Sequence, residues 1–373
     1  MKICVLTSKP LCNNFGGKQA LVSQILEALS SKHEVVLVTF DRKFDTQILD
    51  SRYGLELTKA KFSVINLYSF IPLIHKRLWF LRNHLLTRFA KKNAKDFDLF
   101  FSASGELDLG KKIGVQVLYF PTLTLFNKKG GSFIGSLIRR ICFMLSGMSI
   151  DNMRKNKTIG ISEWVAKQAN KDYKISSETI YPWVENLSDN PNFIKSFEHR
   201  KTGFVCVARF SREKRIQDII SILKKVHENN SEIHLHIVGD VQDKEYFEEI
   251  KDSIKDYNWI KIEGKLARKE MIKLLVTHKF GIHAMHDEHF GIVIAEMVFG
   301  GMIPFVHNSG GQVEIVAENS KLIYESVDDA VKKIESVLGN QNQQDLLKVL
   351  LRNKNQFTRE EFKNKMLEFV SNI

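Results

Sequence analysis

Short apolar runs alternate with helical patterns along most of this 373-residue chain, and this alternation limits the fold more than any other feature. The first run, residues 3–7, is followed by apolar residues at helical spacing over 20–29 and by a second run at 35–40. Continuous short apolar runs are typical of strands that are buried on both faces of a parallel sheet. The sequence therefore predicts an α/β protein in which helices cover parallel sheets.

A cluster of turn-forming residues interrupts the alternation near the middle of the chain, over residues 183–200. Asparagine, aspartate, serine and proline are concentrated there, and strand–helix alternation begins again after them. We therefore expect two doubly wound, Rossmann-like domains that face each other across a cleft. The expected domains are residues 1–185, onto which a C-terminal helix at about 356–373 packs back, and residues 186–355.

Each expected domain contains several strands, and the ligand site of a doubly wound sheet lies at the carboxyl ends of its strands. The strands expected after the first two are 62–67, 99–102, 115–120 and 158–161 in the first domain. Those expected in the second domain are 204–208, 233–238, 259–262, 280–283, 303–307 and 322–324.

The positive charge of the chain, +12 in total, belongs to its N-terminal half. The first 187 residues contain 28 Lys and Arg against 15 Asp and Glu. This surplus predicts an anionic partner for that half: a membrane surface, a phosphorylated acceptor or nucleic acid. The mixed aromatic and basic stretches 70–92 and 126–144 would suit an anionic membrane face, or form basic helices whose apolar stripe packs inward.

The cysteines indicate a reducing compartment, and the apolar stretches indicate neither an export signal nor a membrane span. Four cysteines without a CxxC pair suit buried free thiols. The first apolar run is too short for an export signal, and residues 290–306 suit a buried helix and strand better than a membrane span. We expect a cytoplasmic protein that is peripheral to the membrane.

Two glutamates, Glu288 and Glu296, bracket an apolar segment in the second domain. Glu288 is expected in the loop after strand 280–283, and Glu296 on a helix that begins near Gly291. The N–H groups of a helix start suit phosphate or sugar oxygens, and carboxylates accept hydrogen bonds from sugar hydroxyls. A carboxylate among apolar neighbours would be costly without such a role.

Two further segments could bind a diphosphate. Residues 308–311, Asn-Ser-Gly-Gly, follow an expected strand, and their amides form either an anion-binding nest or a simple tight turn. Arg209 and Lys214 follow strand 204–208, where two cations bind phosphate or belong to a solvated basic loop. Gly16 and Gly17 follow the first strand but lack the GxGxxG pattern of a dinucleotide site.

The histidines give a weaker signal. His234 and His236 share one face of an expected strand, and ordinary strand positions are favoured over a metal pair. His283, His286 and His289 lie near the two glutamates, where sugar contacts or structural roles are favoured over metal binding.

These segments together resemble glycosyltransferase family 4 of the GT-B fold, most closely the mannosyltransferases of lipid-linked oligosaccharide synthesis. The resemblance rests on the Glu-His-Phe-Gly-Ile segment with its E-x7-E spacing, the Asn-Ser-Gly-Gly turn and the Arg-x4-Lys loop. It includes segments 161–164, 180–182 and 119–122, is strong over about 158–320 and is thin over 20–110.

The resemblance implies a role for each of these residues. Arg209 and Lys214 would bind the donor diphosphate and, with Glu288, form the catalytic group, while Glu296 would bind ribose hydroxyls. The donor sugar and phosphate would also contact Phe290, Gly291, Ile292, Ser309, Gly310 and Gly311. Gly16, Gly17 and Tyr119 would form the acceptor and phosphate loop, although Tyr119 stands where these mannosyltransferases usually have a histidine.

The implied activity is retaining transfer of a hexose to a lipid-linked or other glycan acceptor, without a metal or other cofactor. Mannose from GDP-mannose is the first expectation, with UDP-glucose and UDP-N-acetylglucosamine as alternatives. An NAD-type oxidoreductase would need GxGxxG and an acidic residue about 20 positions on. A nucleic-acid partner is not expected, because no zinc-finger spacing or RNP-like strand is present.

Overall fold

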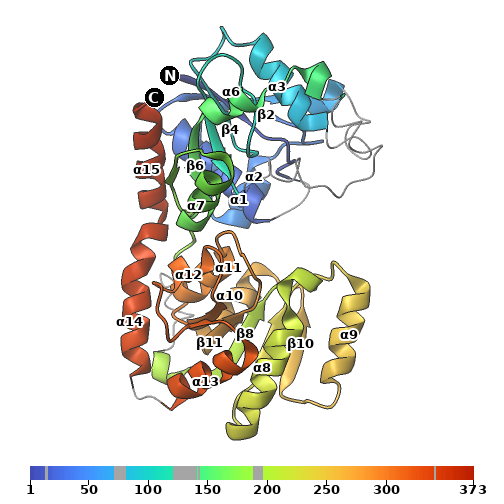
Figure 1. Ribbon diagram of the computed structural model, residues 1–373, viewed down its shortest axis with the longest axis vertical. Coiled ribbons are helices and arrows are strands. Elements are labelled where there is room, and N and C mark those ends of the chain that lie inside the picture. The colour runs from blue at the N-terminus through green and yellow to red at the C-terminus, as the bar shows by residue number, and fades with distance from the viewer. Residues whose placement is uncertain (13–15, 71–80, 121–140, 142, 188–195, 340–341) are drawn as a thin grey trace. The chain divides into compact units, whose positions relative to one another are not determined.

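The computed structural model describes the chain except for residues 13–15, 71–80, 121–140, 142, 188–195 and 340–341. It consists of two compact units: unit 1 is Met1–Trp183 with Glu360–Ile373, and unit 2 is Val184–Arg359. Each unit is built on one parallel sheet with helices packed along it (Figure 1), which confirms the α/β prediction.

Unit 1 contains a seven-stranded sheet in the order β3-β2-β1-β4-β5-β6-β7. Its strands are β1 (Lys2–Leu6), β2 (Glu34–Thr39), β3 (Phe62–Asn66), β4 (Leu99–Ser102), β5 (Val115–Leu118), β6 (Lys157–Gly160) and β7 (Ser177–Thr179). Its described helices are α1 (Gly17–Ser30), α2 (Thr46–Tyr53), α3 (Arg82–Lys92), α6 (Ile150–Lys155), α7 (Glu163–Tyr173) and the C-terminal α15 (Arg359–Ser371).

The strands at the centre and at the edge of this sheet differ in burial. In β1 the four residues after Lys2 are fully buried, because β2 and β4 flank the strand and helices cover the sheet. That is why its sequence is a continuous apolar run. The edge strand β7 is only partly buried and has the sequence Ser-Glu-Thr, which contains no apolar run. The sequence therefore did not predict this strand.

Unit 2 contains a six-stranded sheet in the order β10-β9-β8-β11-β12-β13. Its strands are β8 (Lys201–Val207), β9 (Leu235–Val238), β10 (Ile260–Gly264), β11 (His278–His283), β12 (Ile303–His307) and β13 (Ile323–Tyr324). Its described α-helices are α8 (Ile216–Asn229), α9 (Lys244–Ile254), α10 (Arg268–Thr277), α11 (Ile292–Phe299), α12 (Gln312–Ile315), α13 (Val327–Leu338) and α14 (Gln343–Asn353).

The order of strands reverses between β8 and β11, which pair with each other in the middle of the sheet. Stacked or tilted aromatic rings on β8, β11 and β12 fill the core there, with centroids 5.2 to 6.3 Å apart: Phe204, Phe280 and Phe305. In a doubly wound sheet the crevice for a ligand opens where the strand order reverses, beyond the carboxyl ends. The loops after β8 and β11 therefore flank the position where a ligand site is expected.

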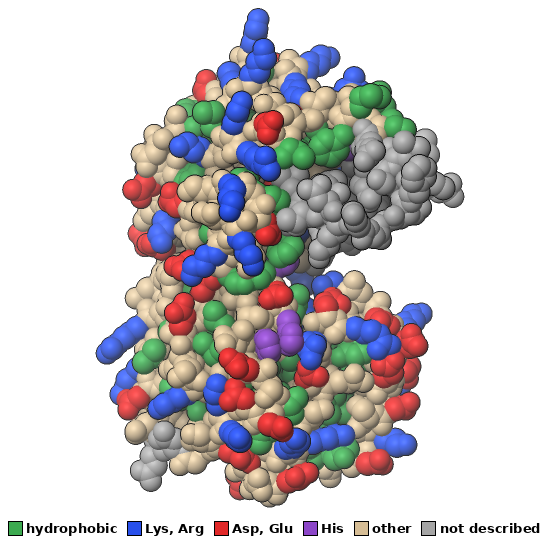
Figure 2. Space-filling view, in the orientation of Figure 1, with side chains coloured by type: hydrophobic (Ala, Val, Ile, Leu, Met, Phe, Trp, Pro, Cys, Tyr) green, Lys and Arg blue, Asp and Glu red, His purple; other side chains and the backbone are tan. Residues whose placement is uncertain are grey.

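The two stretches predicted to suit a membrane face lie largely outside the described residues. Within the described part of the first stretch, α3 buries Leu86 and Ala90 in the core of unit 1, as the inward-packing alternative requires. Among the described residues no helix is both long enough and apolar enough to cross a bilayer. On the face of unit 2 seen in Figure 2, acidic and basic side chains are interspersed.

Candidate functional site

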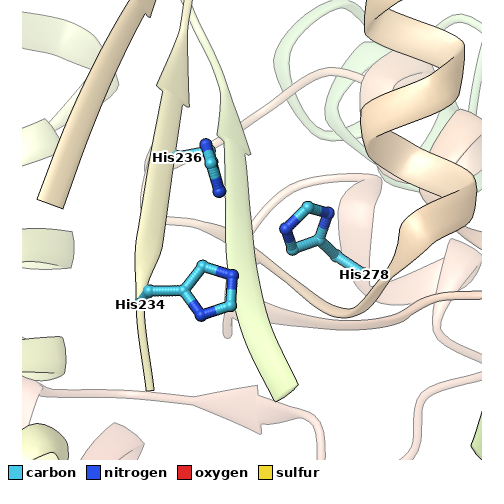
Figure 3. A group of neighbouring side chains, drawn as sticks. All are labelled: His234, His236 and His278. Carbon is cyan, nitrogen blue, oxygen red and sulfur yellow. The ribbon is translucent and has the colours of Figure 1, made fainter. Parts of the chain in front are cut away.

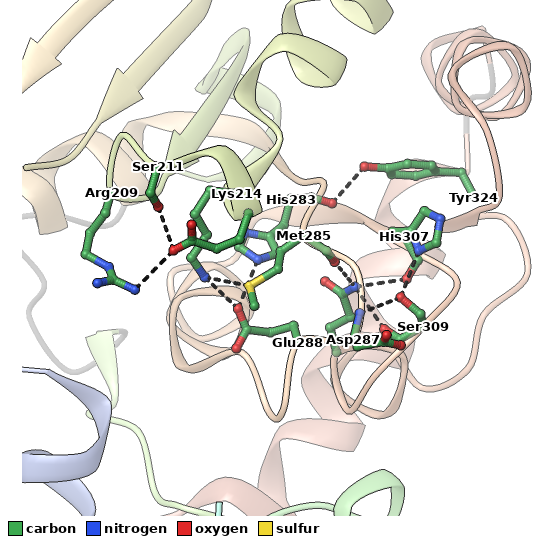
Figure 4. A network of polar contacts seen from close by, with 12 residues as sticks. Arg209, Ser211, Lys214, His283, Met285, Asp287, Glu288, His307, Ser309 and Tyr324 are labelled. Carbon is green, nitrogen blue, oxygen red and sulfur yellow. Dashed lines mark hydrogen bonds and ion pairs between the residues drawn. The ribbon is translucent and has the colours of Figure 1, made fainter. Parts of the chain in front are cut away.

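A buried ion pair joins the loops that follow β8 and β11. Lys214 ends the short 3-10 helix Arg212–Lys214, and Glu288 lies between β11 and α11. Lys214 Nζ is 2.8 Å from Glu288 Oε2 and 3.0 Å from Met285 Sδ (Figure 4). Their side chains are only 14% and 16% exposed. The fold therefore brings two predicted residues, 74 positions apart, into direct contact at the reversal of strand order.

A histidine completes this pair. His283 is the last residue of β11, is buried, and its Nε2 lies 3.3 Å from the same Oε2 of Glu288. Burial lowers the pKa of His283, so the ring is neutral at neutral pH and its Nε2–H donates to the carboxylate. The His283 carbonyl in turn accepts a hydrogen bond from Tyr324 Oη at 2.8 Å.

These contacts keep Glu288 ionised. Burial alone would raise its pKa, but the His283 hydrogen bond and the Lys214 charge outweigh burial and hold the pKa well below its usual range. An ionised carboxylate accepts hydrogen bonds and cannot donate a proton. Glu288 is thus suited to binding hydroxyl groups and to fixing Lys214, and not to general acid catalysis.

Arg209 lies in the same loop as Lys214 but contacts other partners. Its Nη1 donates to Gln242 Oε1 at 2.5 Å, and its Nη2 is 3.6 Å from Glu213 Oε1. Glu213 also accepts a hydrogen bond from Ser211 Oγ at 2.7 Å. The Arg209 side chain is 56% exposed, so these contacts are weak and leave the guanidinium able to turn toward an anion.

The turn formed by residues 308–311 packs directly against the backbone of Glu288. Gly310 has a φ of +77° and forms a parallel bridge with Glu288, and a Cβ added to it would lie 2.2 Å from Glu288 O. Gly311 N–H donates to Glu288 O at 2.7 Å. Glycine is therefore required here by close backbone approach, and the turn fixes the loop that carries the carboxylate.

The phosphate contacts predicted for this turn stay a prediction, because most of its amides have protein partners in this structure. The Asn308 N–H donates to Tyr324 O at 2.7 Å, the Ser309 N–H to His307 O at 2.8 Å, and the Gly311 N–H to Glu288 O. Three of the four amides are thus engaged within the protein and are unavailable to a phosphate in this conformation. The Ser309 hydroxyl is also engaged, because it accepts from Asp287 N at 2.8 Å.

Gln312, which the sequence did not single out, ties the same loops together. Its side chain is fully buried, and its Nε2 lies within 3.1 Å of the carbonyl oxygens of Met285, His307 and Ser309. A lone glutamine after a turn carries no motif, so sequence reasoning had no signal for it. His286 stacks on His307 with ring centroids 3.6 Å apart, which gives it a structural role.

The helix α11 begins at Ile292, directly after its N-cap Gly291, and so starts near Gly291 as the sequence predicted. Gly291 has a φ of +101°, and an added Cβ would lie 2.7 Å from Ile294 Cδ1. Phe290 points into the core, where its ring packs 5.6 Å from that of Phe357, while Ile292 is half-buried. Phe290 can therefore contribute its backbone, but not its side chain, to a ligand site at the helix start.

Glu296 is neutralised by a residue that sequence reasoning missed. Its Oε1 is 2.6 Å from Arg268 Nη1, and Arg268 Nη2 is 3.1 Å from Glu185 Oε2. The Glu296 side chain is 11% exposed, and this ion pair explains how a carboxylate lies among apolar residues of α11. A predicted contact between Glu296 and ribose would share the carboxylate with Arg268.

The predicted acceptor loop lies in unit 1. Gly16 and Gly17 are exposed at the start of α1, and Tyr119 follows β5. Tyr119 Oη donates to Ala103 O at 3.1 Å and lies 3.4 Å from Lys18 O, while Lys18 Nζ is 4.9 Å from the ring centroid. Burial raises the pKa of Tyr119. The structure thus places Tyr119 beside the glycine loop, with its hydroxyl bonded to backbone.

Comparison with protein families found a match for the second half of the chain. Residues 189–353 match the family described as glycosyl transferases group 1. These residues make up nearly all of unit 2, including the Lys214–Glu288 pair and the 308–311 turn.

Curated relatives share the name GDP-Man:Man(3)GlcNAc(2)-PP-Dol alpha-1,2-mannosyltransferase. The protein from Dictyostelium discoideum is 23% identical over 46% of this chain and 37% of its own length. The protein from Yarrowia lipolytica is 30% identical over 30% of this chain and 20% of its own length. The chain thus matches well under half the length of these relatives. The Homo sapiens protein is 23% identical over 88% of this chain and 78% of its own length.

Solved structures resemble the chain over its full length. A glycosyltransferase from Rickettsia africae has a TM-score of 0.70 at 16% identity, covering 100% of this chain and 98% of its own. Anabaena HepE, solved in complex with UDP and glucose, has a TM-score of 0.70 at 15% identity, covering 100% of both chains. At this identity the likeness establishes the fold, and it confirms the predicted GT-B fold.

Proposed function

We propose, from the premise that residues 189–353 belong to the group 1 glycosyl transferases, that this protein transfers a hexose from a nucleotide sugar to a lipid-linked or other glycan acceptor, with retention of anomeric configuration. GDP-mannose is the preferred donor, because the curated relatives are named as GDP-mannose enzymes. UDP-glucose is the second candidate, because Anabaena HepE has been solved with it.

The buried Lys214–Glu288 pair carries this proposal. An ammonium group has three N–H donors, and Glu288 and Met285 occupy two directions around Lys214 Nζ. Among the described residues Lys214 Nζ has no third hydrogen-bond partner, and we propose that an oxygen of the donor diphosphate takes that place. Negative charge grows on that diphosphate as the bond to the sugar breaks. A fixed cation that is largely shielded from water stabilises such charge strongly, and the N-terminus of α11 adds a partial positive charge.

The two glutamates argue for transfer and against acid–base hydrolysis. A glycosidase needs one carboxyl group that is protonated and a second that acts as base or nucleophile. Here the pKa of Glu288 is held low and Glu296 is paired with Arg268. Both carboxylates are therefore suited to accepting hydrogen bonds: Glu288 from the donor sugar, and Glu296 from the ribose hydroxyls.

Binding of the donor tests the first part of the proposal. The chain is unfolded thermally in the presence of GDP-mannose, UDP-glucose, UDP-N-acetylglucosamine or NADH. A ligand at about 100 times its Kd stabilises the folded state by about 2.7 kcal/mol, so its effect on Tm is readily measured. GDP-mannose should raise the Tm most. Stabilisation by NADH with none by any nucleotide sugar would replace the transferase by an oxidoreductase.

Replacing Lys214 tests the mechanism. Lys214→Met should lower kcat/KM for sugar transfer by at least about 100-fold, the usual loss when a charge-stabilising group is removed. The matched control is Lys265→Met, an exposed lysine of unit 2 that pairs with Asp240. Equal activities in the two variants would remove Lys214 from the mechanism.

Two further parts of the proposal concern the surroundings of the reaction. Transfer should need no metal, because Lys214 fills the role of the cation, and activity should survive EDTA. Unit 1, with the positive surplus of the chain, is proposed to face the anionic phosphate of the acceptor at the cytoplasmic membrane surface. Flotation with vesicles that contain anionic lipid should carry the protein, and vesicles of neutral lipid should not.

A further inference from the structure

Three histidines meet at the amino end of the sheet in unit 2, opposite to the ion pair. His234 directly precedes β9, His236 is the second residue of that strand, and His278 is the first residue of β11 (Figure 3). Each offers a ring nitrogen within 4.8 Å of the others. The ring centroids are 4.8 to 5.3 Å apart. The sequence predicted that the first two share a face, and the strand order adds the third.

A glycine makes room for these rings. Strand β8 runs between β9 and β11, and Gly203 is its third residue. A Cβ on Gly203 would lie 2.2 Å from His234 Nε2 and 2.3 Å from its Cε1. Any side chain at this position would therefore overlap the imidazole of His234, and its absence lets rings from β9 and β11 approach each other across β8.

The second nitrogen of each ring already has an acceptor. Nδ1 of His278 lies 2.8 Å from Leu274 O, and Nδ1 of His236 lies 2.7 Å from Glu263 Oε1. Nδ1 of His234 lies 3.5 Å from the carbonyl oxygen of Glu232, a weaker contact. A neutral imidazole that donates from Nδ1 has its lone pair on Nε2. The three rings therefore turn lone pairs, and not N–H groups, toward one another.

One of these lone pairs is buried without a partner. The His278 side chain belongs to a residue that is 1% exposed, and among the residues the structure describes its Nε2 has no hydrogen-bond partner. An unsatisfied buried polar atom costs about 1–3 kcal/mol and is uncommon in folded proteins. A bound cation would satisfy it.

We propose that His234, His236 and His278 bind one divalent transition-metal ion, preferentially zinc, through their Nε2 atoms. Imidazole nitrogen is a preferred ligand of zinc, at about 2.0–2.1 Å, and water can complete a tetrahedral site. Such a site places its nitrogens roughly 3.3 Å apart. Closure therefore requires the rings to turn inward, and His234, half-buried and held at Nδ1 only by a contact of 3.5 Å, is the least constrained of the three.

The surroundings of the cluster include charges of both signs. Glu263 accepts from His236 Nδ1, the carboxylate–histidine–metal arrangement that orients a ligand and raises its basicity. Glu263 is shared with Lys261 at 2.9 Å. Lys201, the strand partner of His278, adds a positive charge that opposes a cation. For a metal ion to bind, the attraction of three imidazole ligands and of the Glu263 carboxylate must therefore exceed the repulsion from Lys201.

The ion would be structural. The cluster lies at the amino ends of β8, β9 and β11, whereas Lys214 and Glu288 follow the carboxyl ends of β8 and β11. A metal there clips β9 to β11 across β8 and takes no part in sugar transfer. The proposal is thus independent of the proposed function and compatible with metal-free chemistry.

Cobalt titration tests the site in the untagged 373-residue chain after its metals are removed. Co²⁺ substitutes for zinc and has an absorption spectrum that distinguishes four-coordinate from six-coordinate sites. We expect one Co²⁺ per chain with a four-coordinate spectrum, displaced by Zn²⁺, and a higher Tm in zinc. Six-coordinate spectra or several weak ions per chain would show adventitious binding to surface histidines and overturn the proposal.

Variants identify the ligands. His234→Gln removes a half-exposed ring, so the fold should survive, and Co²⁺ affinity should fall at least about 100-fold. Glu263→Gln should weaken binding about 10–100-fold, as loss of an outer-shell partner does. His227→Gln is the control, because that ring stacks on Trp259 outside the cluster, and should bind Co²⁺ as the wild type does. Unchanged affinity in His234→Gln would overturn the proposal, whereas donor binding should be the same with and without zinc.

Discussion

The two ends of the sheet in unit 2 bury polar side chains in opposite ways. At the carboxyl end, Lys214 and Glu288 are both charged and neutralise each other at 2.8 Å. At the amino end, His278 is kept neutral, because burial lowers its pKa to about 4. Burying a charge is costly unless it is paired, so a protein either pairs the charge or suppresses ionisation. In the proposed function the first solution leaves a cation fixed for an anionic ligand, and in the proposed metal site the second leaves lone pairs for a metal.

Among substitutions at the carboxyl end of the unit 2 sheet, replacing Gly310 should lower the free energy of unfolding most. In Gly310→Ala the new Cβ would meet the backbone oxygen of Glu288 at 2.2 Å, and φ is +77°. Strain and overpacking together should lower the free energy of unfolding by about 4 kcal/mol. Gly264→Ala is the control, since its φ is +67° but nothing lies within 4 Å, and should cost about 1 kcal/mol. Urea unfolding measures the loss of unfolding free energy in both variants. Equal losses would show that the loop containing Glu288 moves to accommodate the new Cβ.

Removing one partner of the ion pair should be the next largest effect. Lys214→Met leaves the buried Glu288 carboxylate with His283 alone, and we expect a loss of about 3 kcal/mol in unfolding free energy. Glu288→Gln leaves Lys214 similarly uncompensated. The double variant should lose less than the sum of the single losses, as contacting charges do in a double-mutant cycle. Additive losses would mean that the charges do not interact.

Acid should separate wild type from Glu288→Gln. The pKa of Glu288 is depressed in the folded state, so as pH falls the unfolded chain takes up this proton first. The stabilisation from ionised Glu288 is therefore full above its unfolded pKa of about 4.3 and is lost as pH falls toward the folded pKa. Below about pH 5 the wild type should lose stability faster than Glu288→Gln. Urea unfolding from pH 7 to 3 measures this, and parallel curves would contradict it.

The smallest effect on the free energy of unfolding is expected from a substitution at the amino end of the unit 2 sheet. Gly203→Ala displaces the half-buried ring of His234, which can swing toward solvent, and alanine also restricts the unfolded chain. We expect less than about 1 kcal/mol of change in unfolding free energy but at least a tenfold loss of Co²⁺ affinity. A large loss of stability with unchanged metal binding would show that the rings are locked and serve packing alone.

The sequence was most informative where local pattern and burial coincide. The apolar runs identified β1, β8, β11 and β12, and Gly291 identified the start of α11, because these features depend on neighbours along the chain. The edge strand β7 was missed for the same reason, since a partly exposed Ser-Glu-Thr segment carries no apolar signal.

The same distinction, between features set by neighbours along the chain and features set by tertiary contacts, applies to the site residues. Lys214 and Glu288 were recognisable because they belong to segments with a family resemblance. Arg268 and Gln312 were not, because each acts through contacts with other segments, such as Arg268 with Glu296, 28 positions away, and Gln312 with the carbonyl of Met285. His278 escaped notice because its partners lie on β9, beyond β8 in the sheet.

By itself the sequence determined the alternation of strands and helices, the excess of positive charge in the first half and the segments that resemble a glycosyltransferase. The tertiary structure decided which side chains meet. In a parallel sheet, consecutive strands are joined by long crossovers, so neighbours in space are set by strand order and not by distance along the chain. That order placed Lys214 beside Glu288 at one end of a sheet and three histidines over Gly203 at the other.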